Sequence, residues 1–242
     1  AVIDVERGAQ PMKRVSEGYE FVIAYNGELY NTAELRSDLE SCGYEFTTDS
    51  DTEVLLYSYI HYGAGCARRL NGIYAFAIYD SMRQCVFLCR DRFGVKPLFY
   101  SQQGTSLVFG SEIKALFKYP GINPELGIEG LCELFAISPA RTAGCGVFKG
   151  IEELKPGTCM YISRRGIHTA KYWQIESTEH RDSYEDTIEN VRELLTDAIR
   201  RQLISDVPVA TFLSGGLDSS FITAVAAREF KKRGKILSTY SF

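Results

Sequence analysis

The segment Leu213-Ser-Gly-Gly-Leu-Asp-Ser-Ser220 contains residue types that bind phosphate groups. It follows an apolar run of strand length at 207–213 and leads into a helical pattern at 219–233. Two glycines let the backbone approach an anion closely, and a helix N-terminus with serine hydroxyls supplies donors. The carboxylate of Asp218, among these donors, suits a phosphate-bound Mg²⁺. The segment therefore predicts a nucleotide-phosphate site, and a plain glycine turn is the alternative.

A second group of polar residues lies in Tyr25-Asn-Gly-Glu-Leu-Tyr-Asn31, after an apolar run at 21–25. Asn-Gly is the strongest short signal for a hairpin, so a tight turn is one interpretation. Four more segments follow along the chain: Ser50-Asp-Thr-Glu53, Leu70-Asn-Gly-Ile-Tyr-Ala-Phe-Ala-Ile-Tyr-Asp80, Arg90-Asp-Arg-Phe-Gly-Val-Lys-Pro-Leu-Phe-Tyr100 and Phe109-Gly-Ser-Glu-Ile-Lys-Ala-Leu116. A turn alone leaves this ordered set unexplained.

The elements around these segments are predicted to be mostly strands up to about residue 175. Short apolar runs separated by turn residues indicate strands at 21–25, 74–79, 86–88, 98–100, 107–109 and 159–162. Helical patterns lie at 31–42, 51–62 and 111–117. We expect Asn31 to cap the first helix with Glu34 as its capping-box partner, and Gly104-Thr105 to form a hairpin turn. This alternation predicts α+β layers.

The polar segment 176–183 is typical of a linker. After it come an amphipathic helix at 184–203, the strand at 207–213, the helix at 219–233 and a strand at 236–242. This order predicts the start of a parallel α/β sheet. We expect two domains, 1–175 and 184–242, and an incomplete second one, because two parallel strands would leave both faces open.

Composition and charge exclude several classes of protein. Among the 242 residues 45% are hydrophobic, and the net charge is −4, without the basic excess or polybasic stretch typical of binding to nucleic acid or anionic lipid. No apolar run approaches the roughly 20 residues that cross a bilayer. The seven scattered cysteines are interpreted as buried free thiols of a cytoplasmic protein, with a metal or disulfide role as the alternative.

The phosphate segment lacks the lysine of G-x-x-x-x-G-K-[ST] and does not match G-x-G-x-x-G. It closely resembles the S-G-G-x-D-S pyrophosphate loop of the ATP-pyrophosphatase (PP-loop) family. The five ordered segments resemble the class II glutamine amidotransferase domain over about residues 1–165, and the combination is similar to the asparagine synthetase family. The resemblance implies an α+β N-terminal-nucleophile-hydrolase-like four-layer sandwich (αββα), followed by the start of an α/β PP-loop domain of the adenine nucleotide alpha-hydrolase-like type.

The resemblance implies roles in a glutamine site. Asn26 and the backbone N–H of Gly27 would donate to the oxyanion of the tetrahedral intermediate. Glu28 and Asp51 would hold the α-ammonium group of glutamine, because two carboxylates suit its three donors. Further glutamine-binding residues at the start of the chain would be Val2 and Ile3.

The resemblance also implies an ATP and pyrophosphate site. Its residues would be Leu213, Ser214, Gly215, Gly216, Leu217, Asp218, Ser219, Ser220 and Phe242, with Asp218 as a Mg²⁺ ligand. Leu213 and Phe242 would lie near adenine, and packing in the core is the alternative for both.

The implied reaction uses glutamine, aspartate and ATP, passes through released ammonia and a β-aspartyl-AMP intermediate, and yields asparagine, glutamate, AMP and pyrophosphate. A homodimer is expected for the intact protein. The family's nucleophilic cysteine and its arginine for the substrate carboxylate would lie before residue 1, and the acceptor pocket would lie beyond residue 242. The 242 residues by themselves are therefore expected to catalyse nothing.

Three alternatives to the asparagine synthetase family differ from it in the domain after the glutamine amidotransferase domain, in the acceptor or in having no activity. Hexosamine and purine-pathway amidotransferases would share the first domain but lack a PP-loop, so the segment at 213–220 argues against them. An asparagine-synthetase-like enzyme could act on another carboxyl acceptor. A degenerate scaffold or binding module would have no activity.

Overall fold

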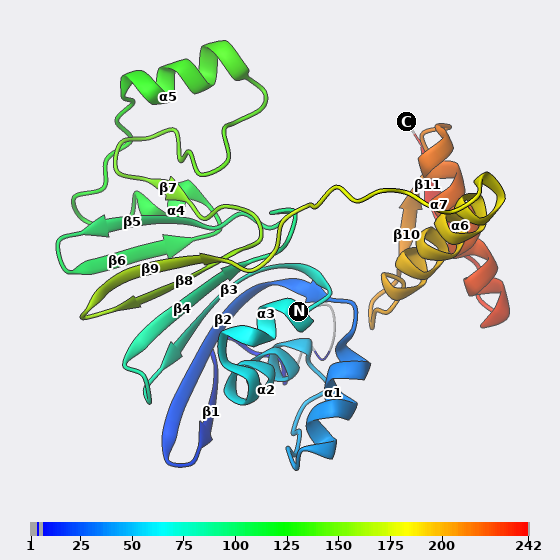
Figure 1. Cartoon of the computed structure of the whole chain (residues 1–242), viewed down its shortest axis with the longest axis horizontal. Coiled ribbons are helices and arrows are strands. Elements are labelled where there is room, and N and C mark those ends of the chain that lie inside the picture. Colours follow the sequence, from blue (N-terminus) through cyan, green and yellow to red (C-terminus); the bar gives the residue numbers. More distant parts are fainter. Residues whose placement is uncertain (1–3, 5–6, 242) are drawn as a thin grey trace. The chain divides into compact units, whose positions relative to one another are not determined.

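The computed structural model describes residue 4 and residues 7–241. The chain divides into two compact units, one of residues 6–175 and the other of residues 176–242 with 1–5. Each unit has its own elements, and the predicted glutamine-binding and phosphate-binding segments fall in different units (Figure 1).

A six-stranded sheet with the order β1-β2-β3-β4-β8-β9 is the centre of the first unit (Figure 1). Its strands are β1 (Met12–Ser16), β2 (Tyr19–Leu29), β3 (Gly72–Asp80), β4 (Cys85–Arg90), β8 (Thr158–Ser163) and β9 (Gly166–Lys171). All neighbouring strands are antiparallel. Strand β2 continues through the Asn-Gly pair, with Asn26 opposite Ala75 and Gly27 opposite Tyr74, so the interpretation of this pair as a tight turn is wrong.

Helices cover one face of this sheet. They are α1 (Thr32–Ser41), α2 (Asp51–Tyr62), the 3₁₀ turn η1 (Gly63–Gly65) and α3 (Cys66–Arg69). The α2 residues Val54, Leu55 and Tyr59 are fully buried in the core between helices and sheet. Asn31 precedes α1 but does not cap it with its side chain. Instead the Asn31 side-chain amide donates to the Arg69 carbonyl at 2.9 Å and accepts from the Asn71 N–H at 2.9 Å. These two bonds connect the start of α1 to the segment just before β3.

A three-stranded sheet packs on the other face of the large sheet. Its order is β6 (Ser106–Gly110), β5 (Phe99–Gln103), β7 (Glu152–Glu153). Leu98 and Leu154 pack against Ala77 and Leu88 between the two sheets. Phe99 points to the opposite side, where it joins Leu116 of α4 (Ile113–Leu116) in a separate cluster. The layers are therefore α, β, β and α, as predicted.

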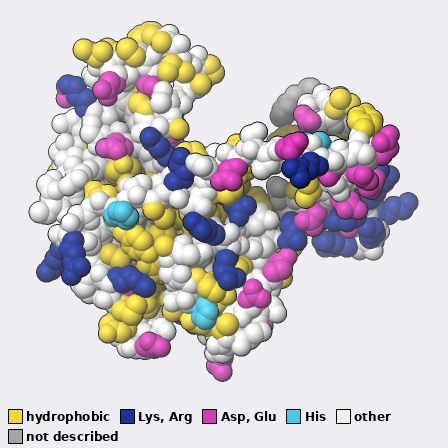
Figure 2. All heavy atoms as spheres, viewed as in Figure 1, with side chains coloured by type: hydrophobic (Ala, Val, Ile, Leu, Met, Phe, Trp, Pro, Cys, Tyr) yellow, Lys and Arg dark blue, Asp and Glu magenta, His cyan; other side chains and the backbone are white. Residues whose placement is uncertain are grey.

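Two features of the first unit lie outside these layers. The hairpin between β5 and β6 turns at Gly104-Thr105 as predicted, with Gly104 at φ +60°. Helix α5 (Ile128–Cys132) and the π-helical turn η2 (Glu133–Ile137) expose apolar side chains, including Ile128 and Phe135. Figure 2 shows hydrophobic side chains gathered on this part of the first unit.

The second unit begins a parallel sheet. Its elements are α6 (Tyr184–Arg201), β10 (Ala210–Phe212), α7 (Leu217–Lys232) and β11 (Ser238–Tyr240). Strands β10 and β11 pair in parallel with α7 between them in sequence, which confirms the predicted β-α-β order. Helix α7 begins at Leu217, two residues before the predicted Ser219. Among the described residues, no helix combines the length and apolarity that crossing a membrane requires.

The cysteines agree only in part with their interpretation as buried thiols. All seven are free. Cys66, Cys85, Cys89 and Cys159 are buried, whereas Cys42 and Cys132 are exposed and Cys145 is intermediate. Within the described ranges, no group of three or more His, Cys, Asp or Glu side chains is arranged to hold a metal ion.

Candidate functional site

Strands β2 and β3 approach each other closely at Gly27, in the segment predicted to bind glutamine. A Cβ atom at Gly27 would lie 2.2 Å from the Ile73 carbonyl oxygen and 2.7 Å from the Tyr74 Cα. These contacts are backbone atoms that cannot rotate away, so only glycine fits. Asn26 and Glu28, on either side of Gly27, are thereby fixed by the strand pairing rather than by a flexible turn.

Asn26 is exposed at this position, and its side-chain Nδ2 donates to the Ser111 Oγ at 3.0 Å. Ser111 follows directly after β6. An amide nitrogen carries two N–H groups, so one remains for a ligand when Ser111 accepts the other. Ser111 lies in one of the segments that mark the resemblance, but its contact with Asn26 was not predicted from the sequence.

Asp51 is the first residue of α2, and its side chain reaches the end of β2. The residue is 7% exposed. The Tyr25 hydroxyl donates to its Oδ2 at 2.9 Å and the Leu29 N–H donates to the same atom at 3.2 Å. Burial raises the pKa of Asp51 above its usual value, and the donors from Tyr25 and Leu29 oppose that rise.

The Asp51 charge acts on Glu28, so the structure places these two predicted residues in the same neighbourhood. Burial is the main reason that the pKa of Glu28 is raised, and the nearby Asp51 charge raises it further. Lys96 acts in the opposite direction on Glu28. Two partly desolvated carboxylates of like charge favour a cation between them, and a protonated amine is one such cation.

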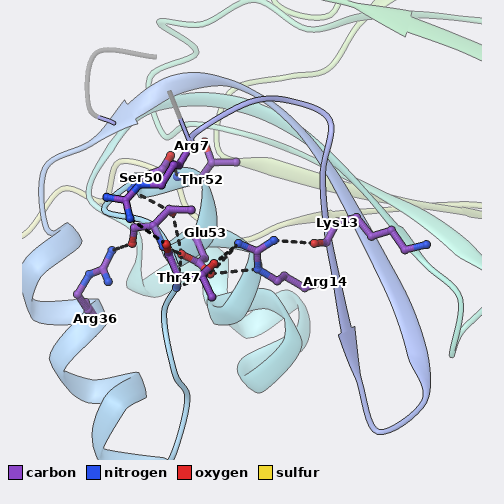
Figure 3. Close-up of polar contacts among 9 residues, drawn as sticks. Arg7, Lys13, Arg14, Arg36, Thr47, Ser50, Thr52 and Glu53 are labelled. Atoms are coloured by element: carbon purple, nitrogen blue, oxygen red, sulfur yellow. Dashed lines mark hydrogen bonds and ion pairs between the residues drawn. The ribbon is translucent and has the colours of Figure 1, made fainter. Parts of the chain in front are cut away.

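The segment that leads into Asp51 is held by an ion pair between the buried Glu53 and the partly exposed Arg14 (Figure 3). Glu53 is fully buried, and its carboxylate accepts from the Thr48 N–H at 2.7 Å and the Thr48 hydroxyl at 2.7 Å. Arg14 donates to Glu53 Oε1 through Nη2 at 2.7 Å and Nε at 3.0 Å. Although burial opposes ionisation, these donors lower the pKa of Glu53. The lock formed by Arg14, Glu53 and Thr48 was not predicted from the sequence.

Lys96 is placed by a tightly held loop after β4. One carboxylate, that of Asp91, accepts the N–H groups of Phe93 at 3.1 Å, Val95 at 3.0 Å and Lys96 at 2.9 Å. Asp91 is 1% exposed. The loop backbone is therefore held in place, and with it the position from which the Lys96 side chain acts on Glu28. A sequence signal for it existed, because these residues lie in the segment 90–100.

The predicted phosphate loop lies between β10 and α7. The Leu213 N–H continues the pairing with the Tyr240 carbonyl at 2.8 Å, and Gly215 has φ +83°, a left-handed conformation suited to glycine. The Ser214 and Ser219 hydroxyl oxygens lie 3.1 Å apart. The loop thus joins the carboxyl end of a parallel strand to a helix N-terminus, where backbone N–H groups can bind phosphate.

Asp218 lies in the first turn of α7 and is exposed. Mg²⁺ in nucleotide sites is commonly bound by one or two carboxylates, with phosphates and water completing its shell. A single exposed carboxylate next to a phosphate loop fits that pattern. Three predicted residues, Val2, Ile3 and Phe242, lie outside the described residues.

The layered fold of the first unit and the phosphate loop of the second agree with comparisons to known proteins. A family model described as "Glutamine amidotransferase domain" matches residues 1–173, and one described as "Asparagine synthase" matches residues 190–242. The first match covers most of the chain, so the chain belongs to the glutamine amidotransferase domain family.

Relatives match the chain over almost its whole length. It is 52% identical over 242 residues to asparagine synthetase [glutamine-hydrolyzing] 3 of Bacillus subtilis, which covers 100% of this chain and 39% of that protein. It is 37% identical to asparagine synthetase [glutamine-hydrolyzing] 1 of the same organism, covering 98% and 37%. Amidase chry2 of Gibberella zeae is 32% identical, covering 98% and 35%. The chain spans less than half the length of these relatives.

A solved structure agrees with the fold. The "structure of the allosteric regulatory enzyme of purine biosynthesis" matches with a TM-score of 0.50 and 20% identity, covering 97% of this chain and 47% of that one. The N-terminal-nucleophile-hydrolase-type sandwich predicted for the first unit is confirmed, and the asparagine synthase match fits the start of a PP-loop domain after it.

Proposed function

We propose that the full-length protein synthesises asparagine from aspartate, using glutamine as the nitrogen donor and ATP as the activating substrate. One observation carries this proposal: a glutamine amidotransferase domain and a phosphate loop of the PP-loop type occur in the same chain. The high identity to a glutamine-hydrolysing asparagine synthetase supports it. The balanced reaction converts aspartate, glutamine, ATP and water to asparagine, glutamate, AMP and pyrophosphate.

In the glutamine half-reaction, Asn26 Nδ2 and the Gly27 N–H stabilise the oxyanion that forms when a nucleophile attacks the side-chain amide. Glu28 and Asp51 bind the α-ammonium group at the other end of the substrate, and Val2 and Ile3 contribute to the same pocket. The fixed strand geometry at Gly27 supports the first role, because oxyanion donors act best when their positions are fixed in advance. The adjacent carboxylates support the second.

In the ATP half-reaction, the loop from Ser214 to Ser220 binds the phosphates, and Leu213 and Phe242 lie near adenine. Asp218 would hold Mg²⁺, which when bound offsets the charge of the phosphate oxygens. The exposed loop at a helix N-terminus supports this assignment.

The same proposal covers organisation and location. Residues 1–175 form the glutamine amidotransferase domain, and 184–242 begin the synthetase domain. The two compact units support this division, except that residues 1–5 group with the second unit. A cytoplasmic location fits seven free thiols, which persist in reducing compartments. A homodimer of the full-length protein stays a prediction that light scattering would test.

The test is a product analysis of the purified full-length protein with glutamine, aspartate, ATP and Mg²⁺. We expect asparagine, AMP and pyrophosphate in equal amounts, at least one glutamate for each asparagine, and no asparagine without ATP. ADP and phosphate in place of AMP and pyrophosphate would contradict the PP-loop assignment. Absence of both glutamate and pyrophosphate would indicate a scaffold without activity.

A second candidate function is transfer of ammonia to a carboxyl acceptor other than aspartate. The similarity to amidase chry2, which is not named as an asparagine synthetase, favours keeping it. Under this alternative, glutamine hydrolysis proceeds while aspartate fails to stimulate pyrophosphate release. Replacing aspartate with a panel of other carboxylic acids in the same assay would then identify the acceptor class.

A further inference from the structure

The hydroxyl group of Tyr25 makes a contact that the proposed roles do not use. Tyr25 lies on β2 one residue before Asn26, and its Oη donates to Asp51 Oδ2 at 2.9 Å. Its ring also packs at the close approach of β2 and β3, since the ring atom Cε2 lies 2.8 Å from the place where Gly27 would carry a Cβ. Tyr25 therefore links the strand of the oxyanion donors to the carboxylate at the start of α2.

The Tyr25 hydroxyl acts on both the position and the charge of Asp51. Asp51 Oδ2 receives two donors, from Tyr25 and from the Leu29 N–H. Two donors on one oxygen hold the carboxylate in one orientation, and its two oxygens together have lone pairs for more acceptor contacts than these two. Hydrogen bonds to the charged form also favour ionisation of Asp51, against the burial that disfavours it.

Tyr25 itself is suited to act only as a donor. Its pKa is raised well above the usual value, mainly by burial and then by the Asp51 charge, so the phenol keeps its proton. A neutral phenol cannot compete with the carboxylates for a substrate ammonium group. Its contribution is therefore to hold Asp51 in the charged state and in one orientation.

We propose that Tyr25 is a positioning residue of the glutamine site, whose hydroxyl orients Asp51 and keeps it ionised to bind the substrate α-ammonium group. The proposal rests on the proposed function, because it needs Asp51 to face glutamine. It assigns Tyr25 no direct part in the attack on the amide.

The test is Tyr25→Phe in the full-length protein, with glutaminase kinetics measured from pH 5.5 to 9. A hydrogen bond to a charged group is worth about 1.5–3 kcal/mol, so we expect the KM for glutamine to rise about 10-fold or more. The kcat should change less than about threefold, since the oxyanion donors are untouched. Asparagine formation from free ammonia should stay at the wild-type rate.

The pH profile separates positioning from packing. Without the Tyr25 donor, the pKa of Asp51 rises, so the acid limb of kcat/KM for glutamine should move to higher pH. The other charged groups near Asp51 remain in the variant: Glu28 on β2, Lys96 after β4, and the Glu53–Arg14 pair between α2 and β1. The shift therefore reports on Asp51.

Tyr59→Phe is the matched control. Tyr59 also donates from a buried phenol to an aspartate, Asp80 Oδ2 at 3.0 Å, but on the part of α2 away from Asp51. This control should lower the melting temperature without changing the KM for glutamine or the pH profile. Unchanged KM and pH profile in Tyr25→Phe would overturn the proposal, as would an equal effect of the two variants. If the wild-type protein hydrolyses no glutamine, the proposed function and the role of Tyr25 both fail.

Discussion

At the scale of single residues, the candidate glutamine site combines two carboxylates whose ionisation is opposed by burial with a side-chain amide. Asp51 and Glu28 are partly or largely desolvated, and burial raises the pKa of both. Asn26 is an exposed residue on β2 and presents a side-chain amide. Ionising these carboxylates in the folded protein costs stability, and a bound ammonium group would offset that cost.

Glu28→Gln should reveal how much stability the ionised Glu28 carboxylate costs the folded protein. The pKa of Glu28 is raised in the folded state, so the wild type loses stability as pH rises through the interval between its unfolded and folded values. The variant lacks that loss. We expect its melting temperature to exceed that of the wild type by about 1–3 °C at pH 7.5 and to match it near pH 4. Differential scanning calorimetry across this range is the measurement, and a pH-independent difference would refute the explanation.

Asn26→Ala tests the oxyanion role. Removal of one such donor typically costs on the order of 10²–10³-fold in kcat, whereas the KM for glutamine should change little because the carboxylates bind the other end of the substrate. Ammonia-dependent asparagine formation should stay near wild type. Because Asn26 lies within a strand, turn strain does not enter the comparison. Full glutaminase activity in Asn26→Gly, with an unchanged melting temperature, would remove Asn26 from the catalytic residues.

At the scale of elements, the start of α2 is the part of the fold that sets the site. Ser50 caps the helix by accepting the Thr52 N–H at 3.2 Å, and Arg36 holds the Thr48 carbonyl at 2.8 Å (Figure 3). Together with the lock of Arg14, Glu53 and Thr48, these contacts connect β1, α1 and α2 around one short segment. The segment thereby places Asp51 beside the end of β2.

Arg14→Gln should therefore affect both stability and substrate binding. It leaves the fully buried Glu53 without its ionic partner, and removing one partner of a buried pair costs about 3–5 kcal/mol. We expect a lower melting temperature and a higher KM for glutamine, with a smaller effect on kcat. The control is Arg7→Gln, because the Arg7–Asp49 pair is exposed and such pairs contribute about 0–1 kcal/mol. Equal effects of Arg14→Gln and Arg7→Gln would contradict the lock.

At the scale of the whole molecule, the two proposed half-reactions are assigned to two different compact units. The carboxylate pair and the oxyanion donors belong to the first unit, and the phosphate loop belongs to the second. A substitution in the phosphate loop should therefore impair the ATP half-reaction and leave the glutamine half-reaction intact in the full-length protein.

Asp218→Ala is expected to abolish aspartate-dependent pyrophosphate release while leaving basal glutaminase activity largely intact. The reason is that Asp218 lies at the start of α7, in the unit without the glutamine site. Ser205→Ala, a substitution in the same unit outside the phosphate loop, is the control and should retain both activities. Equal loss of pyrophosphate release and glutaminase activity in Asp218→Ala would show that the functions are not divided between the units in this way.

The sequence by itself determined the layered fold class, the β-α-β order of the second unit and the residues that resemble known motifs. These properties depend on local periodicity and on short segments such as 213–220, in which neighbouring residues act together. The hairpin at Gly104 was predictable for the same reason, because the turn requires a residue that tolerates positive φ.

Only the tertiary structure decided how distant segments meet. The Asn-Gly pair forms part of a strand because β3 pairs with it across nearly fifty residues, and this pairing overrides its local preference for a turn. Asn31 bonds to the loop before β3 instead of capping α1. The contacts of Asp51 with Tyr25, and of Glu53 with Arg14, join residues far apart in the chain. Local preference carries no information about such partners, because their hydrogen bonds form only once helices and sheet have packed.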